Sequence, residues 1–374
     1  MTGSPEVLRM NAGELIRFCS AIFQKLGLSE SEATTTAQVL VAADMRGIPS
    51  HGVGRLRRYV NGLKTQQMLS NPKQRVLRES ASTIVVDAGG GMGPPVSEFV
   101  MRKVIEKAEK THAAFGCVRN SNHFGIAGYY AMQALEHDMI GIAMTNTAAL
   151  GVPTFGRQVM FGTNPLAFCA PADKHHAFVL DMSTTVVTRG KLEVCDREGR
   201  SLSAGWAVDK DGLHAQDPKG ILDDMLARRG GGILPLGGAG TEQSGFKGYG
   251  LAVMVDILCA VLCGAPFGPE VYGTPESSAR VSHFFGALKI DGFSDPQSFR
   301  SNMDRMLEGL RNTPLAKGQE RVWFAGEQEF ENQKKAEKDG VPLSLNTTAI
   351  LAALGKEYGV EIPNITSQSK GERP

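Results

Sequence analysis

The chain has 374 residues, of which 42% are hydrophobic and 21% are charged, and its formal net charge is +1. This length is sufficient for a large core and favours two domains over one, while the balanced charge and the lack of a long basic stretch argue against a nucleic-acid partner. The longest apolar run, 251–265, is too short to span a membrane, contains Asp256 and predicts a buried helix, so no membrane partner is expected.

The N-terminus and the cysteines indicate the compartment. Residues 1–10 lack the apolar core of a signal peptide. The six cysteines are scattered, mostly within apolar stretches, and none forms a Cys-x-x-Cys pair. We therefore expect them to be small core residues of a cytoplasmic protein rather than a disulfide scaffold.

Helix signals dominate the first 70 residues. An Asn or Ser followed three residues later by Glu, the spacing of a capping box, occurs at 11–14 and at 29–32. These pairs predict two successive helices, the second ending at Gly47. A third helix is expected over about 50–62.

The middle of the chain changes to short apolar runs between Gly, Pro and Asn turns, which predict strands. An amphipathic helix is expected over 96–111, and helical signals return at 249–263 and 296–311. The expected strands cover 82–87, 115–118, 140–144, 165–170 and 178–181. This order predicts an α/β fold with a mixed sheet covered by helices.

The C-terminal region is expected to be mostly helical over 328–358, with a polar, disordered tail at 366–374. Helices at both chain ends bracket the α/β middle. We therefore predict one discontinuous helical domain (1–78 and 328–374) and one α/β NAD(P)-binding domain (79–327), the latter assignment resting on the motifs below.

A glycine-rich segment, 88–93, lies between the first expected strand and the following helix. It fails the dinucleotide-binding fingerprint, because the third glycine position is Pro94 in one register and Ser97 in the other. No second strand ends in an acidic residue about 20 positions further on. A turn that needs positive φ is the better interpretation, and a Rossmann fold is not predicted.

The first candidate site is the segment that begins with Ser50 and His51. If a helix starts there, His51, Arg55 and Tyr59 are spaced four apart and share one face. Histidine suits the transfer of a hydroxyl proton at neutral pH, and the guanidinium fork suits a substrate carboxylate. The alternatives are a plain N-cap at Ser50 and a solvated helix face.

The second candidate site is 120–128, where polar residues follow a buried strand and precede a helix starting near Ile126. His123 in this segment is the second candidate for acid/base chemistry. The alternative is a buried histidine whose hydrogen bonds are satisfied within the core.

Three further segments favour an anion site. Thr163 follows a turn into a strand and can bind a carboxylate or cap the turn. The hydroxyl side chains of 181–185 can hold a ribose or phosphate, and the glycines of 245–250 with Lys247 open a helix whose N-terminus suits phosphate. No metal motif is present, so no metal is expected.

Taken together and in order, the motifs resemble those of the malate/L-lactate dehydrogenase family over about residues 10–360. The resemblance is carried by 50–52, 121–125, 162–165, 181–185 with Arg189-Gly190, 234–238, 246–250 and 325–327. It implies a non-Rossmann cofactor domain, a homodimer, and hydride transfer between NAD or NADP and a small 2-hydroxy or 2-oxo acid, L-malate first among them.

The same resemblance assigns roles to residues. It implies Ser50 as a relay serine and either His51 or His123 as the acid/base. Substrate contacts are expected from Arg55, Tyr59, Thr163, Arg189 and Gly190. Cofactor contacts are expected from His123, Phe124, Gly125, Ile126, Ala127, Asp181, Met182, Ser183, Phe246, Lys247, Gly326 and Glu327.

Two positions depart from the family pattern. Lys191 stands where the cyclic-imine reductases of the family have a relay aspartate, which favours hydroxy-acid chemistry. Ala325 replaces the usual proline of the last motif, so contacts there are less firmly implied. Ureidoglycolate, sulfolactate, lactate or a diketo sugar acid remain alternative substrates, and a nucleotide-binding protein without catalysis is the alternative of a different class.

Overall fold

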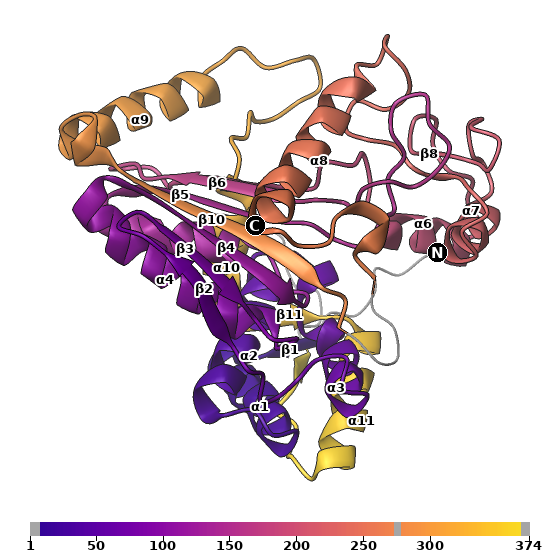
Figure 1. Ribbon diagram of the computed structural model, residues 1–374, viewed down its shortest axis with the longest axis horizontal. Helices are drawn as coiled ribbons and strands as arrows, with labels where there is room; N and C mark the ends of the chain where they lie inside the picture. The colour runs from indigo at the N-terminus through magenta and orange to yellow at the C-terminus, as the bar shows by residue number, and fades with distance from the viewer. Residues whose placement is uncertain (1–7, 273–277, 368–374) are drawn as a thin grey trace.

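The computed structural model describes residues 8–272 and 278–367. Its centre is a seven-stranded mixed sheet in the order β2-β3-β4-β10-β5-β6-β7 (Figure 1). Only the pair β3 and β4 is parallel, and every other neighbouring pair is antiparallel. The strands are β2 (Arg75–Glu79), β3 (Thr83–Asp87), β4 (Ala113–Ser121), β5 (Met139–Thr145), β6 (Leu166–Ala170), β7 (Phe178–Met182) and β10 (Val281–Lys289).

Helices cover both faces of this sheet. α4 (Gly93–Thr111) and α5 (Ala127–Gln133) pack on one face, and α8 (Gly245–Cys259) packs on the other (Figure 1). The main core lies between α4, α5 and the sheet and is rich in Val and Ala. α9 (Pro296–Arg311) lies beyond the β6 and β7 side, where the Asp304 carboxylate accepts three backbone N–H groups of 173–175.

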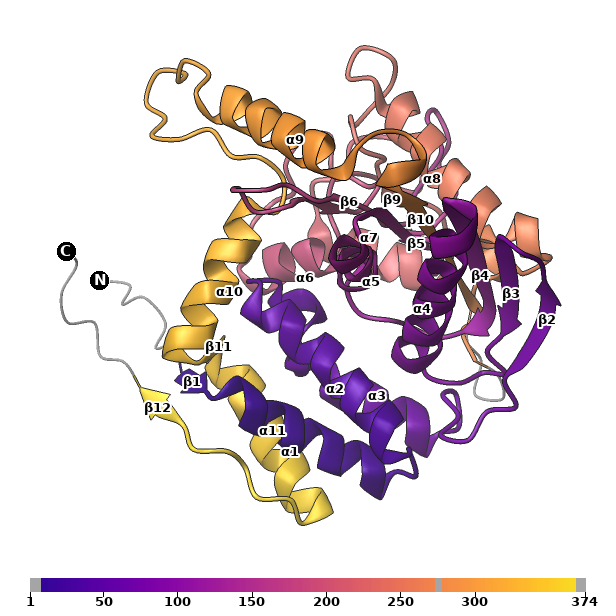
Figure 2. The ribbon, with the colours of Figure 1, turned by 90° about the vertical axis from the view of Figure 1, so that its left-hand side faces the viewer.

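Helices from the two chain ends pack together around a second core (Figure 2). Its core draws on residues 10–68 and 341–354, with Met92 added from the sheet segment. The small sheet β11-β1-β12 joins the two ends. The elements are β1 (Leu8–Met10), α1 (Ala12–Lys25), α2 (Glu30–Met45), α3 (Leu56–Lys64), α10 (Glu327–Asp339), β11 (Val341–Leu343), α11 (Leu345–Tyr358) and β12 (Thr366–Ser367).

A third, smaller core fills the polar stretch between β7 and α8. Leu192, Cys195 and Ile221 pack there with the short β8-β9 pair. Its elements are α6 (Arg189–Arg197), β8 (Ala207–Val208), α7 (Pro218–Leu226) and β9 (Gly232–Ile233). This lobe is joined to the seven-stranded sheet just after the end of β7, through β-bridges such as the one between Thr185 and Pro235.

The predicted strands and most helices are confirmed to within a few residues, but the central strand β10 is not predicted by the sequence. His283 and Gly286 interrupt its apolar run, and both are tolerated because the strand is buried between β4 and β5. The capping box is complete at Ser29 with Glu32, whereas the bond described at Asn11 is the one from the Glu14 N–H.

Three other expectations need correction. The helix expected over 50–62 begins only at Leu56, after two 3-10 turns, because extended backbone at Gly52 interrupts it. The helix over 245–263 is not buried throughout, since less than half of it is covered. The tail expected to be disordered begins with β12, which pairs with β1, and 368–374 lie outside the described residues.

The cysteines agree with the prediction of small core residues. Five of them are buried and Cys263 is half-buried, and all six are free thiols.

Candidate active site

The buried carboxylate of Asp44 holds the loop that carries His51. The loop consists of the 3-10 turns Pro49–His51 and Val53–Arg55. Asp44 at the end of α2 is 3% exposed and accepts the Val53 N–H at 2.6 Å. A Cβ at Gly52 would overlap this carboxylate, so glycine is required there. Burial raises the pKa of Asp44 to about 7, against the opposing effect of the Val53 N–H.

The segment that carries His123 rests on the glycine-rich turn. The Asn122 side chain donates to the carbonyls of Gly90 and Gly91, both at 2.9 Å. A Cβ at Gly93 would overlap the carbonyl oxygens of Asn122 and His123. Gly90 has φ of 81°, which confirms the positive φ expected in this turn. The glycines thus allow two backbone segments to approach closely and place His123.

The two candidate histidines form one unit. The rings of His51 and His123 stack with centroids 5.4 Å apart. The Tyr59 hydroxyl lies 2.6 Å from His123 Nδ1, which also accepts the Gly125 N–H at 3.2 Å. Ser50 Oγ lies 3.0 Å from His51 Nδ1. Tertiary structure therefore joins the first and second sequence clusters into one site.

Both histidines are held neutral. Burial, followed by the positive charges of Arg55 and Arg58, lowers the pKa of His51 to about 4. Burial, followed by the charges of His51 and the same two arginines, puts the pKa of His123 well below its usual range. A bound carboxylate beside the arginines offsets their charge and therefore raises both values.

A cavity of about 350 Å³ opens in front of these rings. Its lining brings together five of the predicted site residues: His51, His123, Phe124, Gly125 and Thr163. Thr163 is fixed by its N–H, which donates to Thr147 Oγ1 at 3.0 Å. Arg58, which the sequence analysis does not single out, also lines this cavity.

A buried histidine of the central strand, His283, contacts two residues that line this cavity, Thr145 and Phe124. His283 bonds Thr145 Oγ1 through Nδ1 at 2.7 Å and Ser121 Oγ through Nε2 at 2.9 Å. Its ring stacks on Phe124 at 4.4 Å between centroids. Burial lowers the pKa of His283 to about 3, so it is a neutral structural support.

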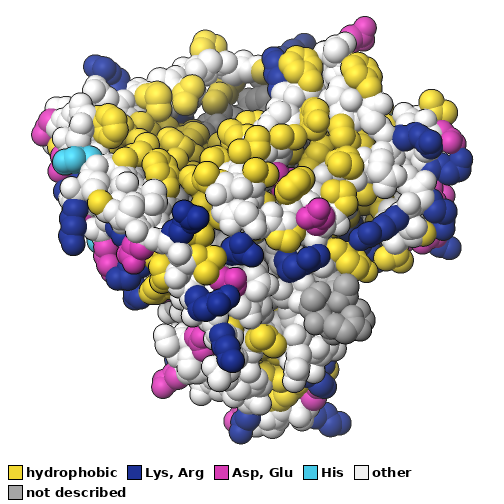
Figure 3. Space-filling view, in the orientation of Figure 1, with side chains coloured by type: hydrophobic (Ala, Val, Ile, Leu, Met, Phe, Trp, Pro, Cys, Tyr) yellow, Lys and Arg dark blue, Asp and Glu magenta, His cyan; other side chains and the backbone are white. Residues whose placement is uncertain are grey.

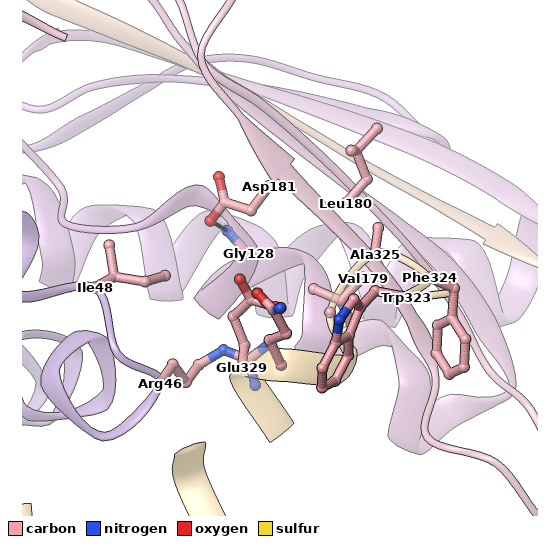
Figure 4. Close-up of a pocket in the computed structure, with 12 residues that line it drawn as sticks. Arg46, Ile48, Gly128, Val179, Leu180, Asp181, Trp323, Phe324, Ala325 and Glu329 are labelled. Atoms are coloured by element: carbon pink, nitrogen blue, oxygen red, sulfur yellow. Dashed lines mark hydrogen bonds between the residues drawn. The ribbon is translucent and has the colours of Figure 1, made fainter. Parts of the chain in front are cut away.

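A second cavity of about 280 Å³ is lined in part by Gly128 of α5 (Figure 4). Asp181 and Glu329 point into it, with Arg46 and Trp323 on its wall (Figure 4). Asp181 accepts the Gly128 N–H at 2.7 Å, and burial raises its pKa to about 6. Gly128 is only three residues after Gly125 of the first cavity, so both cavities border the same turn.

Only part of the last predicted motif, 325–327, lines this second cavity. Glu327 is 1% exposed and forms ion pairs with Arg311 and Arg321, so its charge does not face the cavity. Its assignment as a cofactor residue stays a prediction. The carboxylate from this segment that lines the cavity belongs to Glu329, two residues later, while Gly326 lines it as predicted.

The side chains of Tyr59 and Arg55 form hydrogen bonds that hold His123 and the His51 loop in position. Tyr59 is fully buried and its hydroxyl lies beside His123 Nδ1, so its assignment as a substrate contact stays a prediction. Arg55 Nε donates to the Ser50 carbonyl at 2.5 Å and steadies the loop.

Other predicted residues are absent from the lining of the two described cavities. Arg189 begins α6 beside Gly190 and pairs with Glu193 at 2.9 Å on the surface. Phe246 and Lys247 occupy the exposed first turn of α8. None of these appears in the described lining of either cavity. The remaining predicted residues flank the lining in α5 and β7: Ile126, Ala127, Met182 and Ser183.

Two neutral histidines and the Arg58 guanidinium line one cavity, which suits a small organic acid, and an indole and two carboxylates line the other. The chain belongs to the malate/L-lactate dehydrogenase family, whose family model matches residues 10–352. It is therefore a 2-hydroxy-acid dehydrogenase with the non-Rossmann fold that the sequence predicts.

Similar proteins and structures agree with this membership. Malate dehydrogenase of Pyrococcus abyssi is 40% identical over 354 residues, which are 95% of this chain and 96% of that protein. L-sulfolactate dehydrogenase of Methanocaldococcus jannaschii is 36% identical, over 91% of this chain and 94% of that protein. The crystal structure of malate dehydrogenase from Entamoeba histolytica has a TM-score of 0.92 and 32% identity, covering 96% of this chain and 100% of that one.

Proposed function

We propose that the protein is an NAD(P)-dependent L-malate dehydrogenase that interconverts L-malate and oxaloacetate. The observation that carries the proposal is the stacked His51–His123 pair beside two arginines, because hydroxy-acid oxidation needs a proton acceptor and a carboxylate-binding cation in one place. The 40% identity to a malate dehydrogenase supports malate as the substrate.

The two histidines have different roles in this proposal, which their hydrogen bonds support. His123 Nδ1 accepts the Gly125 N–H and the Tyr59 O–H, so its single proton lies on Nε2. That nitrogen donates a hydrogen bond to the substrate oxygen and has no lone pair for a proton. His51 Nδ1–H can donate to Ser50 Oγ, which leaves Nε2 free to accept. His51 therefore takes the hydroxyl proton, and Ser50 fixes its tautomer.

In this proposal Arg55 binds the C1 carboxylate: its side chain is outside the described lining of the histidine cavity, but its positive charge acts on His51. Thr163 lines the same cavity and can donate its hydroxyl to this carboxylate. Binding the anion there raises the pKa of His51 toward neutrality, which suits proton transfer in either direction.

The second cavity has groups that fit the adenosine half of a dinucleotide. Trp323 offers a face for adenine, and Asp181 offers carboxylate oxygens for ribose hydroxyls. The nicotinamide half then lies in the histidine cavity, where it exchanges hydride with C2 of the substrate. Titration with NADH should quench Trp323 emission, and Trp323→Phe should abolish most of that quenching while Trp206→Phe keeps it.

The charges around that cavity favour NAD over NADP. Asp181 and Glu329 contribute two negative charges against one positive charge from Arg46. A 2′-phosphate would meet this net negative lining, whereas a 2′-hydroxyl can donate to it. NADH should therefore bind more tightly than NADPH, and Asp181→Asn should reduce the difference.

A homodimer in the cytoplasm is part of the proposal. Large apolar side chains gather on the face that carries α8 (Figure 3), and Met254, Ile257, Val261 and Leu262 are exposed there. The one carboxylate of this helix, Asp256, points inward to Asn146 and Asn164, so this face is apolar enough for a second copy to cover. Light scattering should give a dimer, and Ile257→Glu should give a monomer.

Absorbance at 340 nm tests the activity. NADH or NADPH is mixed with oxaloacetate, pyruvate, 3-sulfopyruvate and other 2-oxo acids. Oxidation that is fastest with oxaloacetate supports the proposal, and faster oxidation with sulfopyruvate would move it to sulfolactate. Cofactor binding without turnover of any 2-oxo acid would support a nucleotide-binding protein instead.

A further inference from the structure

The histidine cavity contains one permanently charged side chain among its described lining residues, Arg58 in the first turn of α3. It is exposed, and no ion pair or hydrogen bond engages it within the described part of the chain. Its neighbours differ: Arg57 and Lys64 on the same helix both pair with Glu357, at 2.5 and 3.0 Å. Arg58 is thus a cation available to a ligand.

A second cation exceeds what the minimal reaction requires. One carboxylate, next to the reacting carbon, is common to all 2-hydroxy acids, and the proposed function gives it to Arg55, which lies outside the described lining and acts on His51 through its charge. The other charged candidates near the cavity are neutral, since His51 and His123 are both held unprotonated. The cavity can therefore accept a ligand with a second negative charge without meeting a described carboxylate.

We propose that Arg58 binds the anionic group at the far end of the substrate and selects C4 dicarboxylates over monocarboxylic 2-hydroxy acids. This inference rests on the proposed function and specifies its substrate class. A guanidinium recognises a carboxylate and a sulfonate by the same charge-assisted hydrogen bonds. The substrate panel distinguishes the two anions.

The test compares Arg58→Gln and Arg58→Lys with Arg57→Gln, a matched control from the same helix that does not line the cavity. kcat/KM is measured with L-malate, 3-sulfolactate and L-lactate under one cofactor concentration. Removal of Arg58 also removes a charge near His51, but both substrates use that histidine, so the ratio of their kcat/KM values cancels this effect.

Arg58→Gln should lower the malate-to-lactate ratio by about 10- to 100-fold, the range for losing a charge-assisted hydrogen bond, mainly through KM for malate. Arg58→Lys should recover part of the ratio, and Arg57→Gln should leave it unchanged. The substrate, malate or sulfolactate, whose kcat/KM falls more in Arg58→Gln identifies the anionic group that Arg58 binds.

An equal loss for malate and lactate would overturn the proposal and make Arg58 a ligand of the common carboxylate. No loss for either would also overturn it. Calorimetric titration with the non-reacting pair tartronate and oxamate gives an independent readout: Arg58→Gln should weaken the dicarboxylate alone. Failure of the wild-type protein to turn over any hydroxy acid would instead refute the proposed function, while this binding comparison still decides the role of Arg58.

Discussion

Replacing His51 by Gln separates the two histidines. The glutamine side chain can keep a hydrogen bond to Ser50 but cannot take up a proton, and it leaves the His123 contacts with Tyr59 and Gly125 intact. A positioned acid/base group contributes about 10²- to 10⁴-fold to the rate, or about 2.7–5.5 kcal/mol. We expect kcat for malate oxidation to fall by that factor.

The pH profile gives a second measure of the same change. Wild-type kcat for oxidation should rise with pH along a limb set by His51, whose pKa of about 4 in the free protein is raised by the substrate carboxylate. His51→Gln should lack this limb. Initial rates at 340 nm between pH 4.5 and 9, with malate deuterated at C2 to isolate the hydride step, measure both effects.

His123→Gln is the matched variant, because an amide N–H can replace the donor on Nε2. Its loss should be no more than about tenfold, the effect of one weakened hydrogen bond, and the pH limb should remain. If His123→Gln instead removes the limb while His51→Gln retains more than a tenth of the activity, the tautomer argument is wrong and His123 is the acid/base.

Four other changes test the support of the site. Tyr59→Phe removes the hydroxyl 2.6 Å from His123 Nδ1 and should lower kcat/KM about tenfold, measured in the same assay, with a circular-dichroism melt to show that the fold persists. Gly52→Ala should displace the His51 loop from Asp44 and lower kcat with a smaller effect on the stability measured by Tm. An unchanged kcat would show that the loop tolerates the added methyl group. Arg55→Lys keeps the charge but loses the Nε–H that steadies the loop and the fork for a carboxylate, so kcat/KM should fall at least tenfold, and an unchanged value would remove Arg55 from the site. The pKa of Asp44 is raised to about 7 in the folded protein, so its contribution to the free energy of unfolding is present below about pH 4 and is lost as pH rises through 7. Denaturant titrations of Asp44→Asn should therefore show a free energy of unfolding that depends less on pH over this interval.

Much of this protein could be predicted from the sequence because the relevant physics is local. The capping pair at Ser29 and Glu32 fixes the start of a helix within one turn, and alternating apolar runs fix short strands. The motifs around His51 and His123, taken with the others and in order, indicate the family, because an ordered set of residue identities can be read directly from the sequence. The failure of the glycine-rich segment to match a nucleotide fingerprint likewise follows from residue identities alone.

Tertiary structure decided the rest, because burial and charge pairing depend on residues distant in the chain. β10 becomes the central strand only when β4 and β5 flank it. Glu327 and Glu329 look equivalent in sequence, yet two arginines neutralise the first and leave the second facing a cavity. Arg57 and Arg58 are adjacent, yet helix geometry turns one toward Glu357 and the other toward the histidines, and only the folded chain shows which cation is free to bind a substrate.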